Sequence, residues 1–174
     1  STLRRSSTTA PTTGMANTMN ARMASLPSAM AVRVLEEEMR TPTQPTEEAL
    51  RRAVERANTE IYRASKEREG CLGMGTTITA LCMEGNIAHI AQVGDSRAYL
   101  CRGGSIRQLT RDHSMVQQLV DSGQITREQA AIHPQKNLIT RALGVSANIV
   151  PEYNRCGWRH SALVFRWLDQ HGVG

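Results

Sequence analysis

The most constraining feature of the sequence is a change of hydrophobic period near residue 70. Residues 46–68 have the spacing of an amphipathic helix, with one apolar stripe formed by Leu50, Val54, Ala57 and Ile61. A glycine-containing stretch over residues 70–75 interrupts this pattern, and the apolar residues then fall into short runs typical of β-strands. Helices followed by consecutive strands favour an α+β fold over strict α/β alternation.

The remaining elements follow from the same patterns. A helix is expected over residues 28–40 and a Thr/Pro linker over 41–45, and Thr46 opens the next helix with Glu47 and Glu48 in its first turn. Two hairpins are expected, one with strands 76–83 and 87–93 and one with strands 98–101 and 106–109. Short helices follow over 114–121 and 126–132, the second with a capping box formed by Thr126 and Gln129.

The two ends of the chain differ in composition from its middle. Residues 1–35 contain no Asp or Glu, and four of the six aromatic residues lie within the last 22 positions. We therefore expect a divergent, disordered leader over residues 1–27, a core over 28–150 and a divergent tail over 151–174. An acid-free, Arg- and Ser-bearing start is also compatible with a transit peptide.

Composition excludes several classes of protein. No apolar run approaches the ~20 residues of a membrane-spanning helix. The net charge of +5 allows nucleic-acid binding, but the arginines of residues 51–63 alternate with glutamates, which is typical of a solvated helix face. The four cysteines lack the spacing of a zinc site, and Cys82 and Cys101 are expected in the core. A reducing cytoplasm is the expected compartment.

Three short motifs lie in and after the predicted strands: GMGTT (residues 73–77), VGDSR (93–97) and LTRDHS (109–114). Each is weak when taken alone. Asp95, between two strands, has the composition of a turn residue. Asp112, just before a predicted helix, has the position of an N-cap. The information lies in their order and spacing.

In that order the motifs resemble the metal-dependent protein Ser/Thr phosphatases of the protein phosphatase 2C type, and the bacterial branch most. The resemblance covers about residues 28–150 and includes GQIT (123–126), His133-Pro134 and Leu143-Gly144. It implies two antiparallel sheets sandwiched between helices, an α-β-β-α architecture that is truncated here. It also implies hydrolysis of phosphoserine and phosphothreonine on proteins.

The resemblance further implies a site and partners. The family uses two Mn²⁺ or Mg²⁺ ions to activate a water molecule for attack on phosphorus. Asp95 matches the VGDSR aspartate, which helps to bind a third, weaker metal ion in bacterial relatives. Residues 115–140 match a flap that contacts substrate; within it we interpret His133 as a residue that ends a helix. A phosphoprotein substrate, an opposing Ser/Thr kinase and a monomer are expected, with neither nucleic acid nor membrane as a partner.

The principal metal ligands of the family are missing from the sequence. Residues 13–17 stand about where the family has its first Asp-Gly motif, with Thr13 in place of the bridging aspartate. The later Ser-Asp-Gly and Asp-Asn motifs are not found after residue 150. We therefore assign no catalytic residue and expect the chain as written to be an inactive, incomplete phosphatase domain. The alternative is a pseudophosphatase that binds phosphoproteins or acts as a regulatory module.

Frame errors in the coding sequence offer a second explanation of the missing motifs. When the codons allowed for residues 163–172 are read one nucleotide forward, they permit Leu-Cys-Ser-Asp-Gly-Leu-Thr-Ser-Met. Its Gly is forced, because Trp has one codon and Leu codons begin with C or T. Residues 12–19, read in the opposite shifted frame, permit Asp-Gly-His-Gly-Glu-His-Asn.

The frame hypothesis is tested by reading the encoding DNA in all three frames. We expect Ser-Asp-Gly in the shifted frame across residues 165–168, and an Asp-Gly pair in the opposite frame near residue 13. A shifted frame without Ser-Asp-Gly would rule out the hypothesis and leave the pseudophosphatase as the explanation of the missing aspartates.

Overall fold

The computed structural model describes residues 15–40, 46–157 and 162–166, with side chains over residues 25–40 and 46–157. Four helices and six strands are assigned within these ranges. In chain order they are α1 (Met15–Arg40), α2 (Thr46–Glu67), β1 (Ile78–Glu84), β2 (Ile87–Val93), β3 (Arg97–Arg102), β4 (Ser105–Gln108), α3 (Met115–Asp121), α4 (Arg127–Ala131), β5 (Glu152–Gly157) and β6 (Ala162–Arg166).

The helix pair forms one layer of the molecule. The stripe predicted for α2 is confirmed, because Leu50, Val54, Ala57 and Ile61 are all buried. Helix α1 begins at Met15, well before the start expected at Ser28, and it takes in residues 15–27 of the expected leader. Pro27, which is fully buried, lies inside this helix. The apolar spacing that predicts this helix begins only at Met30, after the proline, which itself removes one helical hydrogen bond. Residues 1–14 and the linker 41–45 lie outside the described residues.

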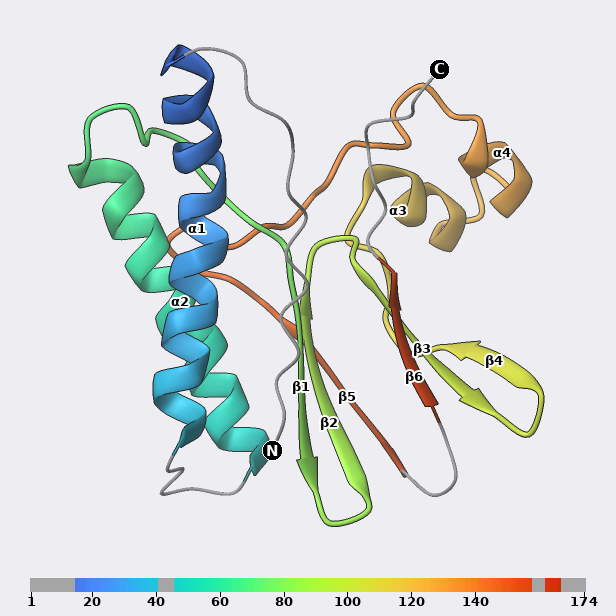
Figure 1. The fold of residues 1–174 in the computed structure, drawn as a ribbon. Helices are drawn as coiled ribbons and strands as arrows, with labels where there is room; N and C mark the ends of the chain where they lie inside the picture. The colour runs from blue at the N-terminus through green and yellow to red at the C-terminus, as the bar shows by residue number, and fades with distance from the viewer. Residues whose placement is uncertain (1–14, 41–45, 158–161, 167–174) are drawn as a thin grey trace.

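Two three-stranded antiparallel sheets form the rest of the core. The first has the order β1-β2-β5 and the second the order β4-β3-β6. Helix α2 packs on the first sheet, whose helix-facing side contributes Ile78, Ala80, Ala91 and Val93 to the main apolar cluster. Figure 1 shows the second sheet on the opposite side of the first, and α3 and α4 beyond one end of the strands.

A second apolar cluster lies between the sheets. It contains Ala88 and Ile90 of β2, Leu100 of β3 and Cys156 of β5. Alternate residues of β2 thus pack into the two apolar clusters, one on each face of the first sheet, as expected for a strand buried on both faces. The predicted α+β class with two antiparallel sheets is confirmed. Within the described residues, α2 packs on the first sheet and α1 packs on α2 (Figure 1).

Strands β5 and β6 come from the part of the chain expected as a tail. Strand β5 pairs with β2 through Ala88↔Cys156 and Gln92↔Glu152, and β6 pairs with β3. Sequence patterns gave no strand here. Residues 158–161 and 167–174 lie outside the described residues.

The local predictions are accurate in the middle of the chain. Both hairpins form with turns at the expected places, and the capping box between Thr126 and Gln129 is present in α4. Cys82 and Cys101, expected in the core, are only half-buried, because both lie toward the hairpin ends of their strands. No described helix is both long and apolar enough to cross a membrane.

Gly94 allows the chain to pass from the first sheet to the second. It follows β2 directly and has a φ of 109°, a conformation that L-residues rarely adopt. A Cβ atom at this position would lie 2.5 Å from the Cβ of Thr77 and would also meet the Thr77 methyl group. Both the backbone angle and the available space therefore require glycine.

We expect Gly94→Ala to lower the free energy of unfolding by about 3 kcal/mol, since backbone strain and overpacking each cost roughly 1–3 kcal/mol. Gly103→Ala is the matched control. Gly103 also has a positive φ, 54°, but has no atom within 4 Å of its Cβ position. Chemical denaturation of both variants compares the crowded position with the open one, and equal losses would contradict the argument that Gly94 is required.

Candidate functional site

The turn formed by residues 94–96 joins β2 of the first sheet to β3 of the second. Asp95 lies in this turn and is half-buried. The turn is at the end of the sandwich where α3 also lies (Figure 1). Asp95 is thus in a turn between two strands, as the sequence predicts, and this turn lies at one end of the paired sheets. Its expected binding of a metal ion stays a prediction.

Buried polar groups hold both sides of this turn. Gln92, which is 0 % exposed, donates from Nε2 to the carbonyl oxygens of Gly94 at 3.0 Å and Ser96 at 3.2 Å. Its Oε1 accepts from the backbone N–H of Arg111 at 3.1 Å. The hydroxyls of Thr77 and Ser96 lie 3.1 Å apart. Gln92 was missed by sequence reasoning, although a lone amide in an apolar strand is the signal that could have found it.

His113 fixes the same turn from the LTRDHS segment. Its backbone N–H donates to the carbonyl of Gly94 at 2.9 Å, and its Nδ1 accepts from the N–H of Gly94 at 3.1 Å. Burial lowers the pKa of His113 and the positive charge of Arg141 lowers it further, against opposing effects of Glu152 and Asp112. The imidazole is therefore neutral at pH 7, as an Nδ1 that accepts a hydrogen bond requires.

Arg97 and Asp112 form an ion pair on the other side of Asp95. Nε of Arg97 lies 2.8 Å from Oδ1 and 2.9 Å from Oδ2 of Asp112, and its Nη2 also contacts Oδ2. Asp112 is 7 % exposed. These hydrogen bonds raise the pKa of the Arg97 guanidinium. Asp112 is therefore a buried ion-pair partner of Arg97; the N-cap of α3 is Ser114, which corrects the sequence interpretation.

The GMGTT motif packs against the Leu143-Gly144 segment. Thr76 of GMGTT forms a β-bridge with Leu143. Gly75 lies so close to this segment that a Cβ atom would be 2.9 Å from the carbonyl oxygen of Leu143. Gly144 follows with a φ of 85°, and its N–H donates at 2.8 Å to the buried Asn58 of α2. GMGTT and Leu143-Gly144 therefore pack as one unit against α2.

The flap-like segment begins at the site and returns to it. Ser114 and Ile139 form a bridge, and the N–H of Met115 donates to the carbonyl of Leu138 at 3.0 Å. Between them stand α3 and α4. His133 comes just after Ile132, the C-cap residue of α4, and its Nδ1 accepts from the N–H of Gln135 at 3.1 Å. This place fits the interpretation of His133 as a residue that ends a helix.

The described residues do not make up a two-metal site. No group of three or more His, Cys, Asp or Glu side chains among them is arranged to hold a metal ion. Asp95 offers hard oxygen ligands of the kind that Mg²⁺ and Mn²⁺ prefer. A single carboxylate does not bridge two dications, so we assign no catalytic step to the described residues.

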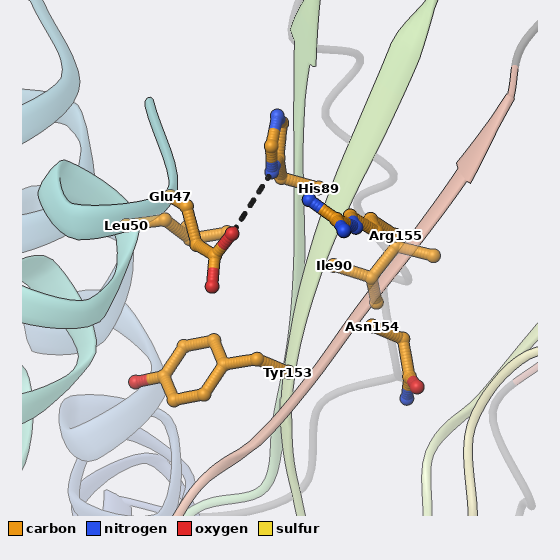
Figure 2. A pocket seen from close by; sticks show the side chains of 7 residues that line it. All are labelled: Glu47, Leu50, His89, Ile90, Tyr153, Asn154 and Arg155. Carbon is orange, nitrogen blue, oxygen red and sulfur yellow. Dashed lines mark ion pairs between the residues drawn. The ribbon is translucent and has the colours of Figure 1, made fainter. Parts of the chain in front are cut away.

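A pocket of about 270 Å³ lies elsewhere, between α2 and the first sheet. Figure 2 shows His89 facing Glu47 across it, with Nδ1 4.0 Å from Oε2 of Glu47. Nε2 of His89 lies 3.1 Å from Oε2 of Glu84, and Thr46 donates to the other oxygen of Glu84 at 3.0 Å. This arrangement ties the start of α2 to the β1–β2 hairpin, so we interpret His89 as structural.

Comparison with known proteins identifies the family. Residues 9–119 match the family model described as Protein phosphatase 2C. The chain belongs to the protein phosphatase 2C family. It is 39 % identical over 127 residues to the serine/threonine phosphatase stp of Listeria welshimeri, an alignment that covers 70 % of this chain and 50 % of that protein.

Solved structures of the protein phosphatase 2C family agree with this fold. The serine/threonine phosphatase PstP/Ppp of Mycobacterium tuberculosis superposes with a TM-score of 0.76 at 33 % identity, covering 82 % of this chain and 61 % of that one. Stp1 of Staphylococcus aureus gives 0.75 at 32 % identity, covering 79 % and 56 %. The chain spans about half the length of the curated relatives it matches. Recognition of the family from its motifs is therefore confirmed.

We expect Asp112→Ala to lower the free energy of unfolding by about 3 kcal/mol, because removing one partner of a buried ion pair leaves the other charge uncompensated. The matched control is Asp121→Ala, which breaks an exposed ion pair with Arg111 and should cost less than about 1 kcal/mol. Denaturant unfolding measures both variants. A loss for Asp112→Ala as small as that of the control would show that the pair with Arg97 is not a stabilising feature.

Proposed function

We propose that this chain is part of a metal-dependent protein Ser/Thr phosphatase that acts on phosphoserine and phosphothreonine. The observation that carries the proposal is the VGDSR turn, which is held between two antiparallel sheets by the LTRDHS segment in a chain of the protein phosphatase 2C family. The relatives are themselves named serine/threonine phosphatases, which supports the same reaction class here.

Asp95 is the proposed metal ligand of the described residues. Its carboxylate suits Mn²⁺ or Mg²⁺, and it occupies a turn whose backbone is fixed on both sides. One related structure, the catalytic domain of PstP at 33 % identity and a TM-score of 0.67, is described as a complex with two manganese ions. A bound divalent ion would supply an activated water molecule and would neutralise phosphoryl oxygens.

The proposal extends to the biological setting. A phosphoprotein is the substrate, a Ser/Thr kinase supplies it, and the enzyme works as a monomer in the cytoplasm. The pseudophosphatase alternative rests on the missing aspartates alone. The comparisons give it no support, because the relatives described above are named phosphatases.

Hydrolysis of p-nitrophenyl phosphate with Mn²⁺ tests the proposal. We expect the chain as written to be at background rate, since the bridging carboxylate is missing. A version that carries the shifted-frame sequences at both ends should turn over substrate and lose this activity with chelator. In that version, Asp95→Asn should raise the Mn²⁺ concentration needed for half-maximal rate, because a neutral amide binds a hard dication more weakly than a carboxylate does.

Two outcomes would contradict this picture. Chelator-sensitive turnover by the chain as written would show that its own carboxylates suffice. A restored version that folds but does not hydrolyse substrate would favour the pseudophosphatase alternative. A circular dichroism melt of each protein is the control for folding.

A further inference from the structure

His113 contacts the Asp95 turn through two different groups. Its backbone N–H donates to the carbonyl of Gly94, and its imidazole Nδ1 accepts from the N–H of the same residue. His113 is 6 % exposed, so these bonds are sheltered from competition with water. Gly94 precedes Asp95 directly. The orientation of the Asp95 turn therefore depends on the placement of His113.

The same residue closes the base of the flap. The carbonyl oxygen of His113 accepts from the N–H of Thr140 at 2.8 Å. The next two residues along the chain continue this pairing through Ser114↔Ile139 and through the bond from Met115 to Leu138. The part of the chain that contains α3 and α4 lies between these two paired segments. His113 thus lies two residues before the flap-like segment 115–140, is bonded to the last residue of that segment, and is a direct neighbour of the turn.

The other ring nitrogen of His113, Nε2, faces β5. Nε2 of His113 lies 3.7 Å from Oε2 of Glu152, the first residue of β5. Asp112, one position earlier, holds Arg97 on the far side of Asp95. Two consecutive residues therefore hold Gly94 and Arg97, on either side of Asp95. A displacement of the flap base at Thr140 would have to be transmitted to the turn or would break one of these bonds.

We propose that His113 is a positioning residue that couples the base of the flap to the turn carrying Asp95. Movement of the flap would thereby alter how the Asp95 carboxylate is presented to a metal ion. The effect on metal binding rests on the proposed function, in which Asp95 binds that ion. The structural coupling rests only on the hydrogen bonds of His113 to Gly94 and Thr140.

Two substitutions separate the imidazole nitrogens. In His113→Asn the side-chain Oδ1 takes the place of Nδ1 and can accept from Gly94. In His113→Gln the amide reaches the position of Nε2 instead and leaves the Gly94 N–H without its acceptor. His133→Gln is the matched control, because it removes a similar bond to the N–H of Gln135 at an exposed position.

The first measurement is amide hydrogen exchange by NMR on the full chain without metal. We expect His113→Gln to speed exchange roughly tenfold at Gly94 and Thr140, the effect of losing about one hydrogen bond, relative to Ala91 in the centre of β2. His113→Asn and His133→Gln should leave both amides within about threefold of the wild-type chain. Comparison with Ala91 separates local coupling from general destabilisation.

The second measurement is Mn²⁺ titration of the version that carries the shifted-frame sequences at both ends, followed by paramagnetic broadening of the amide signals of residues 94–96. His113→Gln should need roughly ten times more Mn²⁺ for half-broadening, whereas His113→Asn should behave like the wild-type chain. The coupling would be overturned if His113→Gln left the exchange rates unchanged or sped exchange at Gly94 but not at Thr140. It would also be overturned if exchange at Ala91 were sped by the same factor. If that version, with His113 unchanged, shows no broadening, the metal role of Asp95 would be overturned instead, and the exchange results would still decide the coupling.

Discussion

The structure depends on the satisfaction of backbone polar groups where the chain crosses between its two sheets. At the turn 94–96 the chain leaves one hydrogen-bonded ladder before it enters the other, so these peptide groups have no strand partner. Leaving one buried and unpaired would cost about 1–3 kcal/mol. Gln92 and His113 supply the missing donors and acceptors at Gly94 and Ser96. The crossing is possible because these two side chains are buried beside it.

This requirement explains why distant motifs occur together. The LTRDHS segment must lie against the turn to pair with Gly94, and the pair between Arg97 and Asp112 holds it there. Gly75 of GMGTT and Gly94 must both lack a Cβ atom, because neighbouring backbone or side-chain atoms occupy that space. Gly144 in turn lies against α2 and is bound by Asn58. One packing unit thus links the helix layer, both sheets and the flap base.

The sequence predicts what is local and misses what is distant. Hairpin turns, the stripe of α2 and the capping box at Thr126 each depend on residues a few positions apart, and all are confirmed. Asp112 was interpreted as a cap because its local signal is that of a cap; its actual partner is fifteen positions earlier in the chain. Strand β5 was not expected because its edge position against β2 gives it no clean alternation. The lone amide of Gln92 in an apolar strand is a local signal, but the role of His113 depends on Gly94, nineteen positions earlier in the chain.

The residues of VGDSR have different roles, and this limits what a match to the motif shows about function. Gly94 is required by backbone conformation, Ser96 by its hydrogen bonds, and Arg97 by its pair with Asp112. Packing and hydrogen bonding alone account for these three residues in this chain, with no catalytic role required. Asp95 is the member for which we propose chemistry. A match to VGDSR therefore reflects mainly residues that the fold requires. Catalysis depends on metal-binding carboxylates, whose presence must be tested separately from the motif.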